Sequence, residues 1–244
     1  MKSAPWPEPP DLAPGEVHLW WVEVGSEDGR ELDWLSAEER ARSERFHQVR
    51  DRRCYVARQA ALRGILAAYL DREPSSIAFA AGAHGKPYLA GAGPADLGFN
   101  LSHSEGRVLL AFARGREVGV DVEAVRILPD MESMAAQVFT PFERAVFEGL
   151  ASAARVPAFF RGWTRKEAAL KALGDGFYRE PSTLHVGLAP SRGDALLRAA
   201  DEPALAGYAL ADLTAPRGFA AALCGQGDDW RARLVCDWER GVAV

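Results

Sequence analysis

The order of hydrophobic and polar residues in the first third of the chain predicts one strand followed by two helices. The segment 15–24 is rich in aromatic and β-branched residues, which favours a strand. A helix over 36–46 is expected to begin with a capping box, because Glu39 follows Ser36 by three residues. A longer helix over about 51–69 carries apolar residues on one stripe. The two helices are expected to form a hairpin.

Short strands and polar turns dominate the middle of the chain. Strands are predicted at 77–81, 107–113 and 117–123. The last two are expected to form a tight antiparallel pair around 114–116. The polar segment FNLSHS, at 99–104, is interpreted as a turn.

The second half of the chain begins with helices and ends with strands. Thr140, Pro141 and Glu143 have the pattern of a helix start. Another helix, over about 157–173, is expected to end at Gly174. Five short strands are predicted after it, at 183–188, 194–200, 207–213, 219–225 and 231–238.

This order of elements predicts an α+β fold, because each half places helices beside a small, mostly antiparallel sheet. We expect two similar lobes in a pseudo-twofold arrangement, an N-terminal lobe over 16–116 and a C-terminal lobe over 117–244. The active site is expected at their junction. The proline-rich segment 1–15 predicts a disordered tail.

Composition narrows the class of protein. Of 244 residues, 48% are hydrophobic and 26% are charged, which is typical of a soluble globular chain with a large core. No apolar run has the length of a membrane-spanning helix, and the first residues do not resemble a signal peptide, so a cytoplasmic location is expected. Cys54, Cys224 and Cys236 are far apart, which argues against a disulfide framework or a zinc site.

Charge is unevenly distributed along the chain. The net charge of -5 argues against a protein that coats nucleic acid. Eight arginines nevertheless lie between Arg40 and Arg63, and this run is either a solvated helix face or a docking surface for an anion. Lysines are rare, and those outside the N-terminal segment are Lys86, Lys166 and Lys171. They fall in two short motifs. The ammonium group of lysine is a compact point charge, and the planar guanidinium group of arginine does not replace it at a site that needs one.

Two acidic residues in the segment VGVDVE are candidates for metal ligands. Asp121 and Glu123 are two apart on a predicted strand, so both side chains leave the same face. Two carboxylates with open positions suit Mg²⁺, which takes its other ligands from water and phosphate. The alternative is an exposed edge strand with alternating acidic residues. The three valines of this segment would face the core, and Gly119 leaves room beside the two carboxylates, which favours the metal site.

The helix within FFRGWTRKEAALKALGDGF, at 159–177, is a second candidate. Its spacing puts Trp163, Glu167 and Lys171 on one stripe. An ordinary exposed Glu–Lys pair would have the same spacing. The surrounding aromatic residues predict a largely buried helix, however, so the charged groups require partners such as a metal ion and a phosphate.

Two upstream motifs add weaker candidates. FNLSHS supplies Ser102 and His103, which are either donors to an anion or the polar residues of a plain turn. GKPY places Lys86 before a proline that restricts its backbone.

Taken in order, these four motifs resemble a known family. GKPY, FNLSHS, VGVDVE and, about 40 residues later, WTRKEAALK are similar to the motifs of the 4'-phosphopantetheinyl transferases of the two-lobed, surfactin-synthetase-activating type. The close match covers 85–177. The resemblance implies that family's fold and reaction. In this reaction, the phosphopantetheine arm of coenzyme A moves to a serine of an apo acyl or peptidyl carrier protein, and adenosine 3',5'-bisphosphate is released.

The resemblance also implies roles for individual residues. Asp121, Glu123 and Glu167 would hold Mg²⁺, or Mn²⁺ in its place, against the pyrophosphate. Asp121, Glu167 and Lys171 would be catalytic, with Glu167 as base, directly or through a metal-bound water, and Lys171 on the pyrophosphate. The residues expected to bind the coenzyme are Lys86, Ser102, His103, Lys166 and Lys171, together with Arg42 and Arg53 at its 3'-phosphate.

The two-lobed form implies a monomer whose partners are coenzyme A and an acidic carrier protein, with the arginine run available for docking. Neither nucleic acid nor a membrane is an expected partner. One alternative is a non-catalytic module of the same fold that binds coenzyme A or a carrier protein. Another is an arginine-mediated nucleic-acid binder, which would have no use for the acidic residues. The motifs do not distinguish fatty-acid, polyketide and nonribosomal-peptide carriers.

Overall fold

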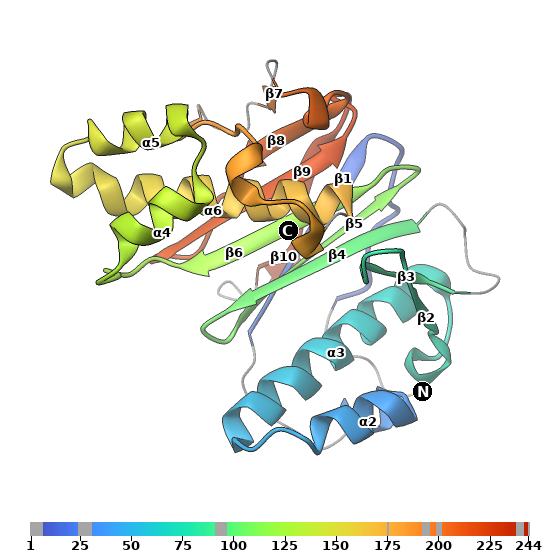
Figure 1. The fold of residues 1–244 in the computed structure, drawn as a ribbon. Coiled ribbons are helices and arrows are strands. Elements are labelled where there is room, and N and C mark those ends of the chain that lie inside the picture. Colours follow the sequence, from blue (N-terminus) through green and yellow to red (C-terminus); the bar gives the residue numbers. More distant parts are fainter. Residues whose placement is uncertain are drawn as a thin grey trace.

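The computed structural model describes residues 7–23, 31–90, 97–174, 176–191, 196–198, 202–237 and 242–243. These residues form four layers (Figure 1). Helix α3 (Val49–Leu70) covers a five-stranded sheet, which packs against a four-stranded sheet, which is covered by helix α6 (Ser152–Leu173). None of the described helices is both long and apolar enough to cross a membrane.

The five-stranded sheet has the order β11-β10-β1-β5-β4. Its strands are β1 (Glu16–Glu23), β4 (Leu97–Ser104), β5 (Arg107–Arg114), β10 (Arg231–Asp237) and β11 (Val242–Ala243). All neighbours are antiparallel except β1 and β10, which are parallel. The short helices α1 (Glu31–Trp34) and α2 (Ala37–Ser43) lie against α3.

The four-stranded sheet is antiparallel, with the order β6-β9-β8-β7. Its strands are β6 (Val118–Ala124), β7 (Leu197–Arg198), β8 (Tyr208–Asp212) and β9 (Phe219–Gln226). The remaining elements are a small hairpin of β2 (Phe79–Ala81) and β3 (Pro87–Leu89), helices α4 (Met131–Val138) and α5 (Pro141–Glu148), and four single-turn 3₁₀ helices, Pro74–Ser76, Gly176–Tyr178, Pro181–Thr183 and Pro203–Leu205.

Alternation along the strands explains why the two sheets stack. Leu19 and Trp21 of β1 belong to the same buried cluster as Val118, Val120 and Val122 of β6, and this cluster fills the space between the sheets. The other face of β1 carries Trp20, which packs with residues of α3 in a second cluster. β1 therefore has apolar residues on both faces, and both faces are covered.

The α+β class predicted from the sequence is confirmed, and so are several local signals. Both capping boxes are present, at Ser36 with Glu39 and at Thr140 with Glu143. Gly174 ends α6 in the left-handed conformation, at φ 76°. The helix before it begins at Ser152, earlier than the sequence predicts, and the first predicted helix ends at Ser43 rather than near Phe46.

One prediction about strand pairing and one about a turn are wrong. β5 and β6 do not form a hairpin, because β5 pairs with β1 and β4 whereas β6 pairs with β9. The valine face of β6 has to cover the first sheet, so the chain changes sheets at Gly115, whose φ is 64°. FNLSHS is not a turn but part of β4. The turn comes after it, at Glu105 and Gly106, which both have positive φ as a two-residue hairpin loop requires.

Two of the later strand predictions also fail or shorten. Residues 184–188 are irregular and follow a 3₁₀ turn, because the backbone N–H groups of Val186 and Gly187 donate to the Glu143 carboxylate instead of a neighbouring strand. Of the strand predicted at 194–200, the structure describes Leu197–Arg198 as β7, and much of the rest lies outside the described residues.

The division into two lobes stays a prediction. β10, which belongs to the C-terminal half by sequence, pairs with β1 of the N-terminal half. Residues 1–6 of the predicted tail lie outside the described residues. Residues 7–15 are irregular chain, and Leu12 among them is buried in the cluster beneath α3.

Gly119 lets α6 lie directly on β6. A Cβ atom at this position would stand 2.8 Å from the carbonyl carbon of Lys171 and closer still to Ala168 O and Ala172 N. These are backbone atoms of a long helix, so they cannot move aside individually. The room that the sequence predicts beside Asp121 is therefore occupied by the helix itself.

We expect Gly119→Ala to lower the melting temperature by about 5–10 °C, because the new methyl group overpacks the contact between β6 and α6 by about 2–3 kcal/mol. Gly149→Ala is the matched control. Its Cβ would have only ordinary contacts of 3.5 Å, so its melting temperature should stay near that of the parent protein. Equal melting temperatures for both variants, measured by calorimetry, would contradict the close contact.

Candidate functional site

Asp121 is the most buried carboxylate of the predicted site, with 4% of its surface exposed. Its Oδ1 accepts hydrogen bonds from Ser102 Oγ at 2.8 Å and from Lys171 Nζ at 2.7 Å. Its Oδ2 is buried and has no hydrogen-bond partner among the described residues. Burial raises the pKa of Asp121 more than Lys171 and Ser102 lower it. The fold thus holds one oxygen in place and leaves the other without a donor.

Glu123 is held in the same way one pleat further along β6. Its Oε2 accepts a hydrogen bond from Ser104 Oγ at 2.9 Å. Burial raises the pKa of Glu123, and the negative charge of Asp121 raises it further. The two carboxylates therefore share one face of β6, as the sequence predicts, and each is bonded to a serine of β4.

Glu167 faces this pair from α6. Burial raises the pKa of Glu167, and the charges of Asp121 and Glu123 add to the effect, while Lys171 opposes it. The structure therefore brings together Asp121, Glu123, Glu167 and Lys171 from elements far apart in the sequence. Three acidic groups share the ammonium group of Lys171 and, at Glu123, the charge of Arg126, so negative charge at this site is undercompensated.

This donor set fits a hard divalent cation. No three His, Cys, Asp or Glu side chains in the described ranges are arranged as a ready-made metal cluster. Mg²⁺, however, commonly takes one or two protein carboxylates and completes its octahedron with water and phosphate. The unpartnered Oδ2 of Asp121 and the mutual repulsion of the carboxylates are the features that such an ion would relieve.

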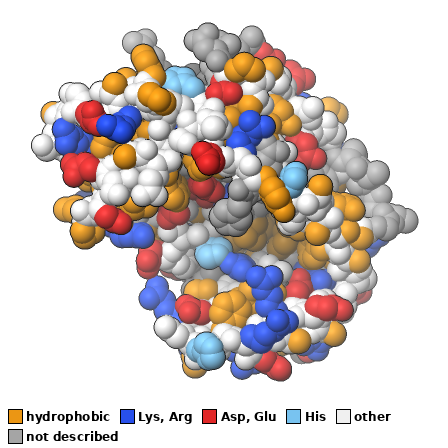
Figure 2. Space-filling view, in the orientation of Figure 1, with side chains coloured by type: hydrophobic (Ala, Val, Ile, Leu, Met, Phe, Trp, Pro, Cys, Tyr) orange, Lys and Arg blue, Asp and Glu red, His pale blue; other side chains and the backbone are white. Residues whose placement is uncertain are grey.

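Basic groups lie on the α3 side of β4, near enough to Lys171 for its charge to act on His103. Arg58 of α3 contacts the ring of His103 on β4, and its Nε is buried with no hydrogen-bond partner among the described residues. Partial burial, Arg58 and Lys171 together lower the pKa of His103 to about 4, so its ring is neutral at pH 7. Figure 2 shows a hollow in this region, with basic and histidine side chains on the wall nearer α3.

Two predicted coenzyme ligands have other partners. Lys86 donates to Glu117 Oε2 at 2.5 Å and to the carbonyls of Val118 and Ala172, both at 3.2 Å. These three acceptors match the three N–H groups of an ammonium. Lys86 therefore joins the β2–β3 hairpin to the start of β6 and the end of α6.

Lys166 does not lie with the carboxylates. It is fully buried at 0% exposure, where it pairs with Glu143 Oε2 at 2.7 Å and donates to the carbonyls of Pro181 and Leu184. All three of its donors are thereby used. The expectation that Lys166 flanks the pyrophosphate is corrected, because a helix turns about 100° per residue and points Lys166 away from its neighbour Glu167.

Arg42 and Arg53 are exposed on α2 and α3. The Arg42 guanidinium lies 5.5 Å from the centre of the Tyr55 ring, and Arg58 lies 5.1 Å from the same ring. Tyr55 thus links Arg42 to the arginine that contacts His103. Two members of the arginine run, Arg42 and Arg58, therefore contact the same ring, and Arg58 reaches β4.

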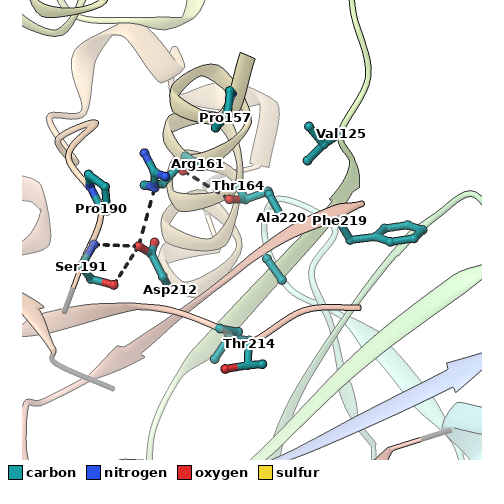
Figure 3. A pocket seen from close by; sticks show the side chains of 12 residues that line it. Val125, Pro157, Arg161, Thr164, Pro190, Ser191, Asp212, Thr214, Phe219 and Ala220 are labelled. Carbon is teal, nitrogen blue, oxygen red and sulfur yellow. Dashed lines mark hydrogen bonds and ion pairs between the residues drawn. The ribbon is translucent and has the colours of Figure 1, made fainter. Parts of the chain in front are cut away.

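A separate pocket of about 370 Å³ opens between α6 and the start of β9 (Figure 3). Ala220, in its lining, is the cross-strand partner of Glu123. Asp212 is the acidic group of this pocket, and both of its oxygens accept hydrogen bonds from Arg165, at 2.7 and 2.6 Å. Its charge is therefore compensated, unlike that of the carboxylates on β6.

Sequence analysis missed three residues of the site, namely Asn100, Ser104 and Arg58. Asn100 Oδ1 accepts a hydrogen bond from Val120 N at 2.9 Å, and Ser104 bonds Glu123. The signal for both is the alternation of polar residues at 100, 102 and 104, which is the period of a half-buried strand. For Arg58 the sequence offers only membership in a long arginine run.

The chain is similar to known proteins along most of its length. The profile of the 4'-phosphopantetheinyl transferase superfamily matches residues 117–224, and that of the 4'-phosphopantetheinyl transferase N-terminal region matches residues 21–114. The chain is 35% identical to the 4'-phosphopantetheinyl transferase HetI of Nostoc sp. strain PCC 7120 over 93% of its own length and 96% of that protein. It is 29% identical to the 4'-phosphopantetheinyl transferase of Bacillus subtilis, over 64% and 66% of the two chains.

Among solved structures, the holo-[acyl-carrier-protein] synthase of Thermotoga maritima is similar at a TM-score of 0.32 and 20% identity. That match covers 46% of this chain and 62% of the other.

The raised pKa of Glu167 predicts a pH-dependent gain in stability for Glu167→Gln. A carboxyl whose pKa is higher in the folded state destabilises the fold when ionised, fully above the folded pKa and not at all below the unfolded value near 4.5. In the presence of a chelator, the variant should melt about 2–4 °C above the parent at pH 8, and the gain should vanish near pH 4.

Glu148→Gln is the control, since Glu148 is exposed on α5 and its pair with Arg144 is a surface pair. It should change the melting temperature little at either pH. A Glu167→Gln variant that is less stable than the parent at pH 8 would show that the charge of Glu167 is compensated in the folded protein.

Proposed function

This chain belongs to the 4'-phosphopantetheinyl transferase superfamily, and we propose that it transfers the phosphopantetheine arm of coenzyme A to a serine of an apo acyl or peptidyl carrier protein at the carboxylates of β6 and α6. The products would be the holo carrier protein and adenosine 3',5'-bisphosphate. The observation that carries this assignment is the buried, unpartnered Oδ2 of Asp121, flanked by two further carboxylates and one lysine.

Asp121, Glu123 and Glu167 are the proposed ligands of Mg²⁺, with Mn²⁺ as a substitute. When bound, the ion supplies positive charge that offsets the negative charge of the pyrophosphate. Asp121 would use Oδ2, because Oδ1 is already held by Ser102 and Lys171. Ser102 thus acts on a carboxylate here, and any contact it makes with a phosphate would be shared with that role.

Glu167 is the proposed base for the hydroxyl of the carrier serine. A general base accepts the proton from the hydroxyl directly or through one intervening water molecule. Lys171 donates to Val120 O and Asp121 Oδ1, which uses two of its three N–H groups among the described residues. The third is available for the oxygen that gains charge as the pyrophosphate leaves.

Basic residues on the opposite wall are the proposed phosphate ligands. Arg58 contacts His103, and partial burial together with the charges of Arg58 and Lys171 lowers the pKa of His103, so two positive groups near this ring are available to a phosphate. Arg53 and Arg42 are proposed for the 3'-phosphate, as the family resemblance implies. The monomeric state, the cytoplasmic location and the exclusion of nucleic acid and membranes remain predictions.

Intact-mass analysis of apo carrier proteins, incubated with the enzyme, coenzyme A and Mg²⁺, tests the function directly. We expect the carrier to gain one phosphopantetheine, and the gain to disappear in excess EDTA, since three carboxylates would otherwise repel the pyrophosphate. Asp121→Ala and Glu123→Ala should each lower transfer by at least about 100-fold, the scale of one strong electrostatic contribution.

The matched control is Glu148→Ala, which removes an exposed carboxylate on α5 and should transfer normally. Transfer that persists in EDTA would refute the metal assignment. If the protein bound coenzyme A but modified none of the acyl and peptidyl carriers, the non-catalytic alternative would replace the proposed reaction.

Calorimetric titration with coenzyme A and with 3'-dephospho-coenzyme A separates the roles of the arginines. Arg53→Ala should weaken coenzyme A about 10- to 100-fold, the value of one charged hydrogen bond, and leave the dephospho form unchanged. Arg144→Ala, which removes an exposed arginine of α5, should alter neither affinity. Equal losses for both ligands would remove Arg53 from the 3'-phosphate site.

A further inference from the structure

β4 presents a row of polar side chains to the unpaired edge of β6. Asn100, Ser102 and Ser104 are two residues apart along β4, so they share one face. Each of them bonds a group on β6, although β4 and β6 belong to different sheets. The spacing of Ser102 and Ser104 thus matches that of Asp121 and Glu123.

Ser104 is distinguished by bonds on both sides of its hydroxyl group. Its Oγ accepts a hydrogen bond from Ala124 N at 3.1 Å and donates one to Glu123 Oε2 at 2.9 Å. The backbone bond occupies a lone pair, so it orients the hydroxyl with its hydrogen toward the carboxylate. A serine held in this way fixes the rotation of the Glu123 carboxylate.

The hairpin turn holds Ser104 at that place. Glu105 and Gly106, with φ of 44° and 78°, form the two-residue loop between β4 and β5, and Ser104 pairs with Arg107 directly beside it. The serine therefore stands at the end of a strand whose register is set by the loop. A flexible surface hydroxyl would not keep one bond geometry in this manner.

We propose that Ser104 is a positioning residue of the transferase, whose hydroxyl fixes Glu123 through Oε2 and keeps Oε1 directed at a divalent cation. The inference rests on the proposed function, in which Glu123 is a ligand of Mg²⁺. Groups that orient metal ligands by hydrogen bonds typically alter metal affinity 10- to 100-fold when they are removed. Ser104 acts through Glu123 and need not touch the substrate.

Binding of Mn²⁺ measured without a carrier protein tests the proposal, because no turnover takes place. Mn²⁺ is titrated by electron paramagnetic resonance into the protein saturated with coenzyme A. We expect Ser104→Ala to weaken Mn²⁺ binding about 10-fold or more, and Ser104→Thr, which keeps a hydroxyl, to restore most of the affinity. In a Glu123→Ala background, Ser104→Ala should cause no further loss.

Ser43→Ala is the matched control, since Ser43 is a buried serine of α2 whose hydroxyl bonds Arg40 O. It should leave Mn²⁺ affinity unchanged. If Ser104→Ala does not fold, Ser104→Cys replaces it, because a thiol fills the space of the hydroxyl and is only a weak donor. Unchanged Mn²⁺ affinity in the folded Ala or Cys variant would overturn the proposal, and so would an equal further loss in the Glu123→Ala background.

Measurements on the parent protein separate a failure of the role of Ser104 from a failure of the metal assignment. If it binds Mn²⁺ and transfers phosphopantetheine while the Ser104 variants bind Mn²⁺ equally well, the role of Ser104 fails and the proposed function stands. If the parent itself binds no Mn²⁺ in the presence of coenzyme A, the metal assignment fails, and the role of Ser104 fails with it.

Discussion

The outer edge of β6 is the constraint on which the rest of this structure depends. One edge of β6 pairs with β9, and four backbone groups of the other edge bond to side chains. The carbonyls of Val118 and Val120 accept from Lys86 and Lys171, while Val120 N and Ala124 N donate to Asn100 and Ser104. An edge strand left open in the interior would forfeit these bonds at a cost of about 1–3 kcal/mol per group. The edge therefore ties the β2–β3 hairpin, β4 and α6 to one strand.

The same arrangement explains why the candidate site lies where it does. Strand pairing on both edges would place the backbone of another strand where Lys171 and Ser104 now reach the edge of β6. Because side chains and not a neighbouring strand bond this edge, β4 and β6 lie next to each other although they belong to different sheets. Lys171 and Ser104 each bond both the backbone of β6 and one of its carboxylates, so the groups that hold the edge also hold the site.

The sequence predicts the parts of this arrangement that depend on local spacing. Asp121 and Glu123 lie on one face because strand periodicity fixes this, and the two capping boxes form because their bonds are local. Which strand pairs with β6 is a different matter, since β5 and β9 are both short and apolar and local patterns do not rank them. The composition of FNLSHS is typical of a turn. The same segment also alternates polar and apolar residues, and this alternation places the polar side chains of β4 against β6. Lys166 and Lys171 are about 140° apart around a helix, so helical geometry alone separates them, whereas the burial of Lys166 against Glu143 depends on the tertiary fold.

The three carboxylates of the site lower the stability of the fold, and the same three groups serve its proposed chemistry. Burial raises the pKa of all three carboxylates, and each ionised group makes the others costlier to ionise. A fold selected only for stability would replace them or pair each with a cation, as Arg165 does for Asp212 and Lys166 for Glu143. Lys171 and Ser102 hold Oδ1 of Asp121 and leave Oδ2 open, so a cation at Oδ2 would not compete with the lysine. The uncompensated charge is therefore ordered before any ligand arrives, and under the proposed function this order would let a divalent ion and a phosphate bind without rearrangement of the strand beneath them.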